Sequence, residues 1–276
     1  MTLTIDVKAG SRRSAAWVAT LSVGCAFTMA ATANDDMEIA KKLNNPIAAM
    51  ISVPFQFNYD ENIGVTEEGS RLVLNVQPVI PFSLNEEWNV ISRTILPLID
   101  QQDIPPATDE SGVGDVFQSM FFSPKSPTAG GWIWGAGPAL LLPTASDERL
   151  GAEKWAAGPT AVVLKQQNGW TYGGLVNHVW SFAGDDDRDD VSNTFLQPFL
   201  AYTTPTLKTI TLNTESTYDW EVEEWSVPVN LMATQLFRVG KQPMSLQLGA
   251  RYWVDAPEAG PDGWGMRLTY TLVFPK

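Results

Sequence analysis

The fold is decided by the last stretch of the chain, which reads Gly265-Met266-Arg267-Leu268-Thr269-Tyr270-Thr271-Leu272-Val273-Phe274. Apolar residues at every second position alternate there with Arg267, Thr269 and Thr271. A period of two predicts a β-strand with one apolar and one polar face. About ten residues is the length that a tilted strand needs to cross a bilayer. If this stretch crosses a membrane, the rest of the chain must repeat it until a sheet closes on itself.

The same alternation recurs from Ile51 onward, with turn residues between the repeats. The expected strands are approximately 51–59, 71–82, 88–98, 112–122, 132–142, 154–164, 170–182, 195–202, 207–213, 225–234, 244–252 and 265–274. The sequence therefore predicts an all-β fold over residues 49–276, a closed antiparallel transmembrane β-barrel. It has about twelve strands, and bacterial outer-membrane barrels have even strand counts.

Composition excludes several other classes of protein. The chain has 276 residues, a net charge of −13 and a single cysteine, Cys25. One cysteine excludes an intrachain disulfide framework. No internal run of about twenty apolar residues occurs, which argues against a helical membrane protein. The 18 Lys and Arg residues are scattered, so a nucleic-acid surface is not expected.

The first 33 residues have the pattern of an export signal. Arg12 and Arg13 precede an apolar stretch over residues 15–30, and Ala31-Thr32-Ala33 forms a small-x-small cleavage site. Residues 34–48 then form an N-terminal periplasmic segment. Within it, Asp35–Asn45 is either a short amphipathic helix that ends at Pro46 or a loosely held leader, and the pattern favours the leader.

Acidic residues predict which way the barrel faces. Most of the 31 acids fall in connections that follow odd-numbered strands, at residues 60–68, 100–115, 147–153, 185–190, 215–224 and 255–262. The other connections are shorter and carry most of their charge as Lys or Arg. Long loops face the cell exterior in such barrels and short turns face the periplasm, so both termini are expected in the periplasm. Tryptophans are expected in a belt at each rim: Trp88, Trp132, Trp134 and Trp170 at the short turns; Trp155, Trp180, Trp220, Trp225, Trp253 and Trp264 at the acidic loops.

Short motifs spread over nearly all of the mature chain resemble one known family. Among them are Asn45-Pro46-Ile47-Ala48, Ser52-Val53-Pro54-Phe55-Gln56, Trp134-Gly135-Ala136-Gly137-Pro138, Leu142-Pro143-Thr144-Ala145, Trp180-Ser181-Phe182-Ala183-Gly184 and Phe274-Pro275-Lys276. Together they resemble the outer-membrane β-barrel family associated with the MetA pathway of phenol degradation. Its members are labelled transporters or, by misannotation, neuromedin U. The resemblance implies a barrel that passes small aromatic compounds, and it supplies no catalytic residues and no cofactor.

The polar faces of the strands supply the candidate pore lining. If the alternation holds, Arg93, Arg251, Arg267, Asn75, Gln77, Gln197 and Asn230 point into the lumen. Phe195 and Phe199 flank Gln197 and could form a stacking wall for an aromatic solute. Rings of charge set pore selectivity, so the arginines would favour anions or aromatic acids. The alternative is that they pair with Asp115 and other loop acids and plug the barrel, and the sequence leaves both open.

Two further features of the sequence are candidate sites, a histidine and a run of aspartates. His178 is the only histidine, and a lipid hydrolase would need it beside a nucleophile. Ser181, three positions away on a strand, falls on the opposite face, so no enzyme is expected. The run Asp185, Asp186, Asp187, Asp189 and Asp190 is rich in oxygen ligands but lacks the spacing of a calcium loop. It is interpreted as a solvated loop, with weak cation binding at the lipopolysaccharide surface as the alternative, and no dedicated metal site is expected.

The sequence thus predicts an exported outer-membrane channel for passive passage of small, apolar or aromatic molecules. The alternatives are a plugged structural or surface-interaction barrel and, less favoured, a lipid-modifying enzyme. Expected partners are outer-membrane lipid and lipopolysaccharide, a small solute, and the barrel-assembly machinery. That machinery would read the C-terminal strand through Phe274, two residues before the chain end.

Overall fold

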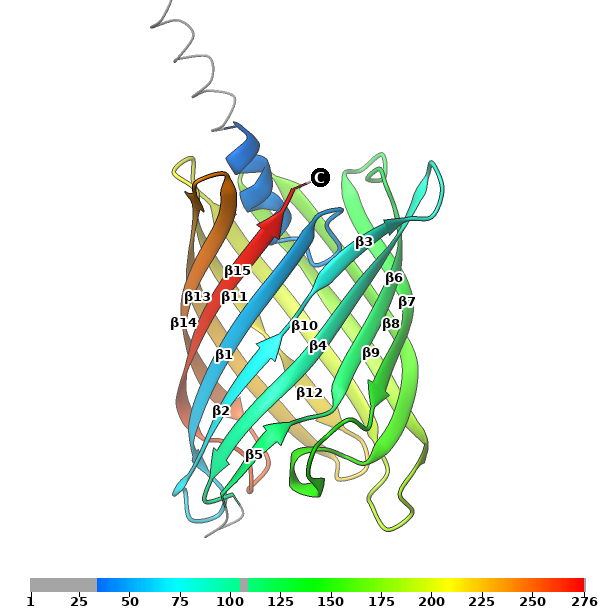
Figure 1. Cartoon of the computed structure of the whole chain (residues 1–276), viewed down its shortest axis with the longest axis vertical. Helices are drawn as coiled ribbons and strands as arrows, with labels where there is room; N and C mark the ends of the chain where they lie inside the picture. Colours follow the sequence, from blue (N-terminus) through cyan, green and yellow to red (C-terminus); the bar gives the residue numbers. More distant parts are fainter. Residues whose placement is uncertain (1–33, 105–108, 276) are drawn as a thin grey trace, which may run out of the picture.

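Each strand of the protein is hydrogen-bonded to an antiparallel neighbour on either side, and the sheet closes on itself (Figure 1). The computed structural model describes residues 34–104 and 109–275; the expected export signal lies outside them. The β segments are β1 Ile51–Ile63, β2 Gly69–Val76, β3 Val79–Ser83, β4 Trp88–Gln102, β5 Glu110–Val113, β6 Val116–Pro124, β7 Trp132–Leu142, β8 Lys154–Gln167, β9 Trp170–Gly184, β10 Ser192–Thr203, β11 Lys208–Thr214, β12 Ser216–Asp219, β13 Glu224–Val239, β14 Gln242–Asp255 and β15 Gly263–Phe274. A 3-10 turn, η1, spans Glu148–Leu150.

The fifteen segments of the described chain make twelve strands, because three strands are each interrupted once. β2 and β3 are one strand broken at Gln77-Pro78, β5 and β6 one strand broken at Gly114-Asp115, and β11 and β12 one strand broken at Glu215. At the last break, Pro198 and Pro228 lie on the two flanking strands, and proline has no N–H to give to a ladder. The predicted closed barrel and its strand count are confirmed, although the ninth strand runs further, to Asp219.

Closure joins the two ends of the chain. β1 pairs with β15 in a continuous register from Ile51 opposite Phe274 to Asp60 opposite Gly265. β9 pairs with β10 over eleven residue pairs, which closes the rest of the wall. In the described part of the chain, no helix is long and apolar enough to cross a membrane.

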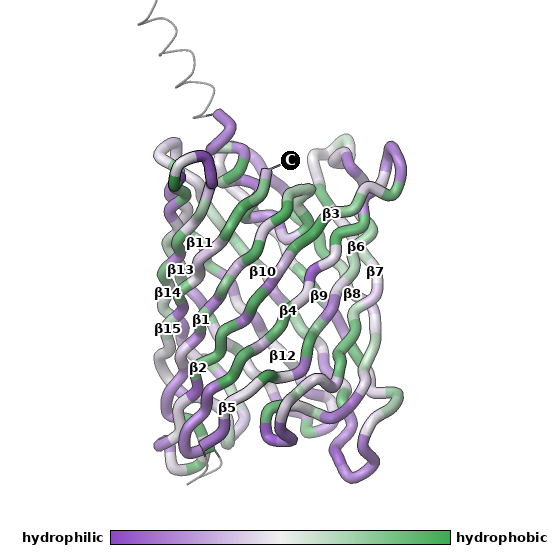
Figure 2. The backbone as a smooth tube through the Cα atoms, in the orientation of Figure 1, coloured by the Kyte–Doolittle hydropathy of each residue, from purple (hydrophilic) through white to green (hydrophobic). Residues whose placement is uncertain are grey.

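The outward side chains are mostly apolar, and many of the inward ones are polar. In β15, Met266 is 65% exposed while the neighbouring Arg267 is 3% exposed. The tube in Figure 2 shows hydrophobic and hydrophilic residues alternating along strands such as β1 and β4. The outer wall is apolar and the backbone hydrogen bonds are closed around the barrel, which are the two conditions for lying in the hydrocarbon core of a bilayer. The alternation in the sequence therefore reports lipid outside rather than a core inside.

The two mouths of the barrel differ. The N-terminal mouth carries the short turns, the helical residues 34–43 and the C-terminus, and the opposite, acidic mouth carries the longer connections (Figure 1). Aromatic pairs follow both rims: Trp88 with Trp134 and Trp170 with Tyr202 at the first, Tyr252 with Trp264 at the second. Trp253 does not join the belt, because its indole points inward and donates to Asp60.

Asp115 shapes the acidic mouth. Its carboxylate accepts backbone N–H bonds from Thr144, Ala145 and Ala152 at 2.7–3.1 Å. It therefore holds the connection between β7 and β8 against the break between β5 and β6. The alternative in which Asp115 pairs with the lumen arginines is not what the structure shows, because its oxygens accept from these backbone donors.

Replacing Asp115 by alanine is expected to release this connection. Three bonds to a charged acceptor are lost, each worth about 1.5–3 kcal/mol, while the wall itself is untouched. Limited proteolysis of the folded protein should cut residues 143–153 much faster in D115A. D186A, which removes an exposed aspartate of the next long connection, should leave this rate unchanged; equal cutting of the two variants would contradict the assignment.

Candidate functional site: the lumen

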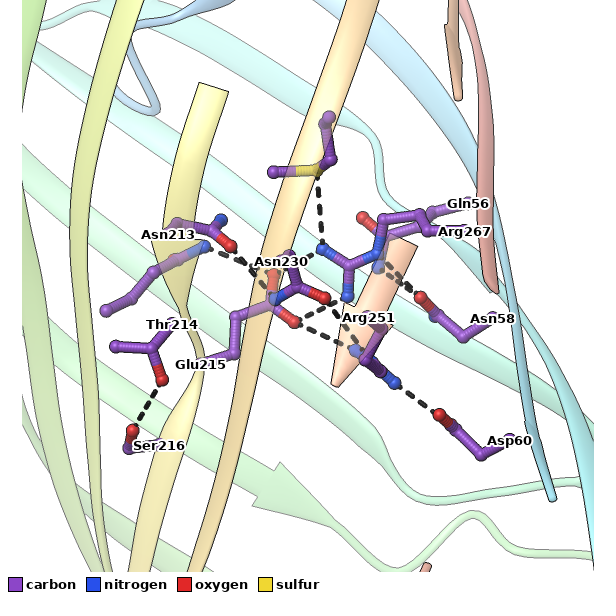
Figure 3. Close-up of polar contacts among 12 residues, drawn as sticks. Gln56, Asn58, Asp60, Asn213, Thr214, Glu215, Ser216, Asn230, Arg251 and Arg267 are labelled. Carbon is purple, nitrogen blue, oxygen red and sulfur yellow. Dashed lines mark hydrogen bonds and ion pairs between the residues drawn. The ribbon is translucent and has the colours of Figure 1, made fainter. Parts of the chain in front are cut away.

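One side of the lumen is organised around Glu215 (Figure 3). Arg267 holds the carboxylate with two bonds, Nη1 to Oε1 at 2.8 Å and Nη2 to Oε2 at 2.6 Å. Arg251 Nη2 donates to the same Oε2 at 3.2 Å, and Gln197 Nε2 donates to Oε1 at 3.3 Å. Fork-to-carboxylate pairs of this kind are among the stronger and more directional contacts in proteins. Glu215 is thus a shared counter-ion for two arginines.

A second set of polar residues accepts the remaining hydrogen bonds of the two arginines and fixes their orientation. Arg251 also donates to Asp60 Oδ2 at 3.0 Å and to Asn230 Oδ1 at 3.0 Å. Arg267 Nε donates to Asn58 Oδ1 at 2.7 Å. The Arg251 guanidinium lies 5.4 Å from the ring of Trp253, within cation–π range. With these partners the network is extensively hydrogen-bonded, and it holds its charges in one geometry.

The sequence had placed Glu215 and Asp60 among the acids of the long loops, and this was wrong for both. Asp60 lies in β1, and Glu215 lies at the break between β11 and β12. The signal that could have found them is the alternation itself. Asp60 continues the inward series of Gln56 and Asn58, and Glu215 continues that of Asn213.

Two of the three predicted arginines, Arg251 and Arg267, therefore do pair with acids, but with acids of the wall and not of the loops. Side-chain exposure is 2% for Arg267, 8% for Arg251 and 19% for Glu215. Charges so enclosed gain stability only when they are matched. On this side the lumen is a fixed salt-bridge network rather than a ring of free positive charge.

The opposite side of the lumen is apolar over a wider area than the sequence predicted, which named only Phe195 and Phe199 there. Ile91, Phe121 and Leu164 are fully buried on inward positions of β4, β6 and β8, and they form one cluster with Val162 and Leu175. Phe195 and Phe199, the predicted stacking wall, pack against this cluster. Hydropathy alone could not separate these residues from lipid-facing ones, because both are apolar. The lumen is amphiphilic, with one polar and one apolar wall.

The N-terminal segment lies across its mouth. Ile39, Ala40, Ala48 and Met50 pack against Leu236 and Val273, and Ile47 reaches further in, to the apolar cluster on the far wall. Polar contacts hold the segment on other strands: Asp36 with Arg238, the Lys41 carbonyl with Gln166 Nε2 at 2.8 Å, and Asn44 with Thr203. The loosely held leader favoured from the sequence is not what the structure shows. Residues 34–43 are helical and packed.

The described residues line two cavities in the lumen. One of 230 Å³ lies toward the N-terminal mouth and is lined by the N-terminal segment, Gln77 and Phe199. The other, of 240 Å³, lies toward the acidic mouth and is lined by Phe117, Leu175 and Phe195. Arg93 lines both, so its side chain borders the two spaces.

The other predicted lining residues lie as follows. Gln77 is 7% exposed and accepts from Arg93 Nη2 at 3.1 Å. Asn230 is fully buried and donates to Asn213. Asn75 stands opposite Gln56, which lines the first cavity. The structure gathers these residues around one lumen, and their part in solute passage stays a prediction.

His178 and the aspartate run lie outside the lumen. His178 stacks on the exposed Trp180 at 4.1 Å and its Nδ1 is 2.6 Å from Thr194 Oγ1, whereas Ser181 donates to Asp190. The Ser181 hydroxyl and the Lys154 ammonium lower the pKa of Asp190, so its carboxylate already has a cationic partner. Among residues 34–104 and 109–275, no three His, Cys, Asp or Glu side chains converge to hold a metal ion. Cation binding by the aspartate run gains no support.

Known outer-membrane barrel structures are similar to this chain to different degrees. The COG4313 outer membrane channel from Pseudomonas putida F1 aligns with a TM-score of 0.65 at 17% identity, over 82% of this chain and 96% of that one. Outer membrane phospholipase A from Escherichia coli aligns at 0.47 and 9% identity, over 83% and 91%. The anion-selective porin from Comamonas acidovorans aligns at 0.38 and 8% identity, over 82% and 98%.

No protein family and no curated protein matches the sequence, so the resemblance to the MetA-pathway family stays an expectation. The likeness to solved structures concerns the fold, because all three identities are low. The chain has the fold of an outer-membrane β-barrel.

Proposed function

We propose that the protein is an outer-membrane channel for passive passage of small, apolar or aromatic molecules, exported by its N-terminal signal. The observation that carries the proposal is the amphiphilic lumen: two cavities of a few hundred Å³ between an apolar wall and a hydrogen-bonded polar wall. Ligand sites are usually concave and mostly apolar, with a few placed polar groups. The apolar exterior and the fold of the Pseudomonas putida channel support an outer-membrane setting.

In such a channel the apolar wall would give weak, successive contacts, and the fixed network would keep the polar wall from collapsing onto it. The acidic mouth would face the cell exterior and the N-terminal mouth the periplasm, as the loop lengths suggest. Lipid would cover the outer wall, lipopolysaccharide would meet the acidic connections, and β15 would present Phe274 to the assembly machinery. The proposed role is non-enzymatic.

Transport is expected to be measurable directly. Purified protein in planar bilayers should give discrete conductance steps, and proteoliposomes should take up small neutral aromatics such as benzyl alcohol faster than glucose. The apolar wall is the reason for that order, because it does not replace the hydrogen bonds that a sugar makes with water. Liposomes without protein give the background rate. The channel proposal would be overturned if planar bilayers showed no conductance steps and proteoliposomes took up solute no faster than liposomes without protein.

One observation favours a second function, a plugged structural or surface-interaction barrel. The N-terminal segment contacts strands on both sides of the lumen and covers the mouth. A barrel that serves only this role would stay impermeable to every solute, while losing the acidic connections would weaken cation-dependent envelope integrity. The same bilayer measurement separates the two.

A further inference from the structure

Arg93 is set apart from the other lumen arginines by its lack of an ion-pair partner. In the part of the chain that the structure describes, Arg93 donates a hydrogen bond to the amide oxygen of Gln77, and no salt bridge reaches it. Glu215 attracts it through space, but both Glu215 oxygens are occupied by Arg251 and Arg267. A guanidinium in a lumen with no carboxylate in contact is free to take one from a solute.

The space beside Arg93 is shaped for an apolar body. Ile95, Phe117, Leu175 and Phe195 line the 240 Å³ cavity together with the amides of Asn177 and Asn193. For comparison, an engineered protein cavity of about 150 Å³ lined by aliphatic and aromatic side chains binds benzene. The cavity is therefore large enough for one aromatic ring with a carboxylate attached.

From this juxtaposition we propose that Arg93 and the cavity toward the acidic mouth bind a small monocarboxylate anion with a single apolar ring, of the benzoate type. Guanidinium matches a carboxylate bidentately, and the apolar walls take the ring out of water. Inorganic anions gain nothing from those walls and lose hydration there. Cations are repelled by the same arginine. The inference rests on the proposed channel and names the chemistry of its solute.

The position of Arg93 between the two cavities gives the site a role in passage. A carboxylate bound by Arg93 borders both cavities. The solute can therefore move from one cavity to the other while its carboxylate stays in contact with the guanidinium. Selection of the solute would then occur inside the wall, after the acidic mouth and before the N-terminal segment.

The test compares benzoate with neutral benzyl alcohol on protein in lipid nanodiscs and in proteoliposomes. Wild-type protein should bind benzoate at least tenfold more tightly than benzyl alcohol. R93Q should lose about 10- to 100-fold in benzoate affinity, the range expected for one charged hydrogen-bond pair, with benzyl alcohol changed less than about twofold. R93K should recover part of the benzoate affinity. R149Q, which removes an arginine from the acidic mouth, should behave as wild type.

The outcomes are separable. Equal affinity of wild-type protein for both probes, or benzoate binding that R93Q leaves intact, overturns the site while uptake of benzyl alcohol keeps the channel. Arg93-dependent benzoate binding without uptake of either probe keeps the site and overturns the channel. If R93Q does not fold, judged by its heat-modifiable electrophoretic mobility, R93K and the wild-type affinity ratio decide the question.

Discussion

Replacing Glu215 by glutamine is expected to destabilise the barrel by the order of 3 kcal/mol, because removing one partner strands the charges of a buried pair. Glutamine keeps the shape, but Arg251 and Arg267 would then face each other with only Asp60 as a counter-charge. Urea unfolding in lipid vesicles, followed by tryptophan fluorescence, measures the loss.

The same substitution is expected to make ion passage through the lumen more anion-selective. A salt gradient across a planar bilayer should give a reversal potential shifted in the anion-selective direction, since lumen charge sets selectivity. E221Q is the matched control, because Glu221 is an exposed acid of the acidic mouth. An E215Q protein that resembles E221Q in both stability and reversal potential would show that the network is not what holds the polar wall.

Removing residues 36–48 is expected to raise single-channel conductance severalfold. These residues cover the N-terminal mouth, and Ile47 spans to the far wall. Without them the lumen would be continuous with the space outside that mouth. Planar bilayer recordings of the deleted and intact proteins measure the change.

A milder variant serves as control for this deletion. D36N loses only the ion pair with Arg238, so the segment keeps its apolar contacts and the conductance step should stay near the wild-type value. The deleted chain must still show the mobility of a folded barrel. A folded, deleted barrel with the wild-type step size would mean that the segment does not limit passage.

The sequence predicted the wall of this protein far better than its interior. The alternation in Gly265–Phe274 was enough to predict the wall, because the lipid outside is uniform and every outward position therefore requires an apolar side chain. The inward positions share no single requirement, because each side chain there depends on its own partner. Arg267 forms its ion pair with Glu215, and Phe121 packs in one cluster with Ile47; each partner is distant in sequence.

Glu215 shows where that limit lies. Its place in the inward series was visible, yet it stood among small polar residues a few positions before Asp219 and Glu221, and this composition suggested a loop. The break came from prolines on neighbouring strands, which only the pairing reveals. The helix before Ile51 is the same case, because its apolar face has no recognisable partner until the strands surround it.

The seam between β1 and β15 has a consequence for how the molecule is made. Its hydrogen bonds join residues more than two hundred positions apart, and contacts of such long range form slowly. Until β15 pairs with them, β1 and β14 each have an edge with unpaired backbone N–H and C=O groups. The segment that precedes β1 must already lie inside the partly closed sheet at that stage. Barrel closure therefore waits for β15, whose pairing with β1 also encloses the segment that packs against Val273.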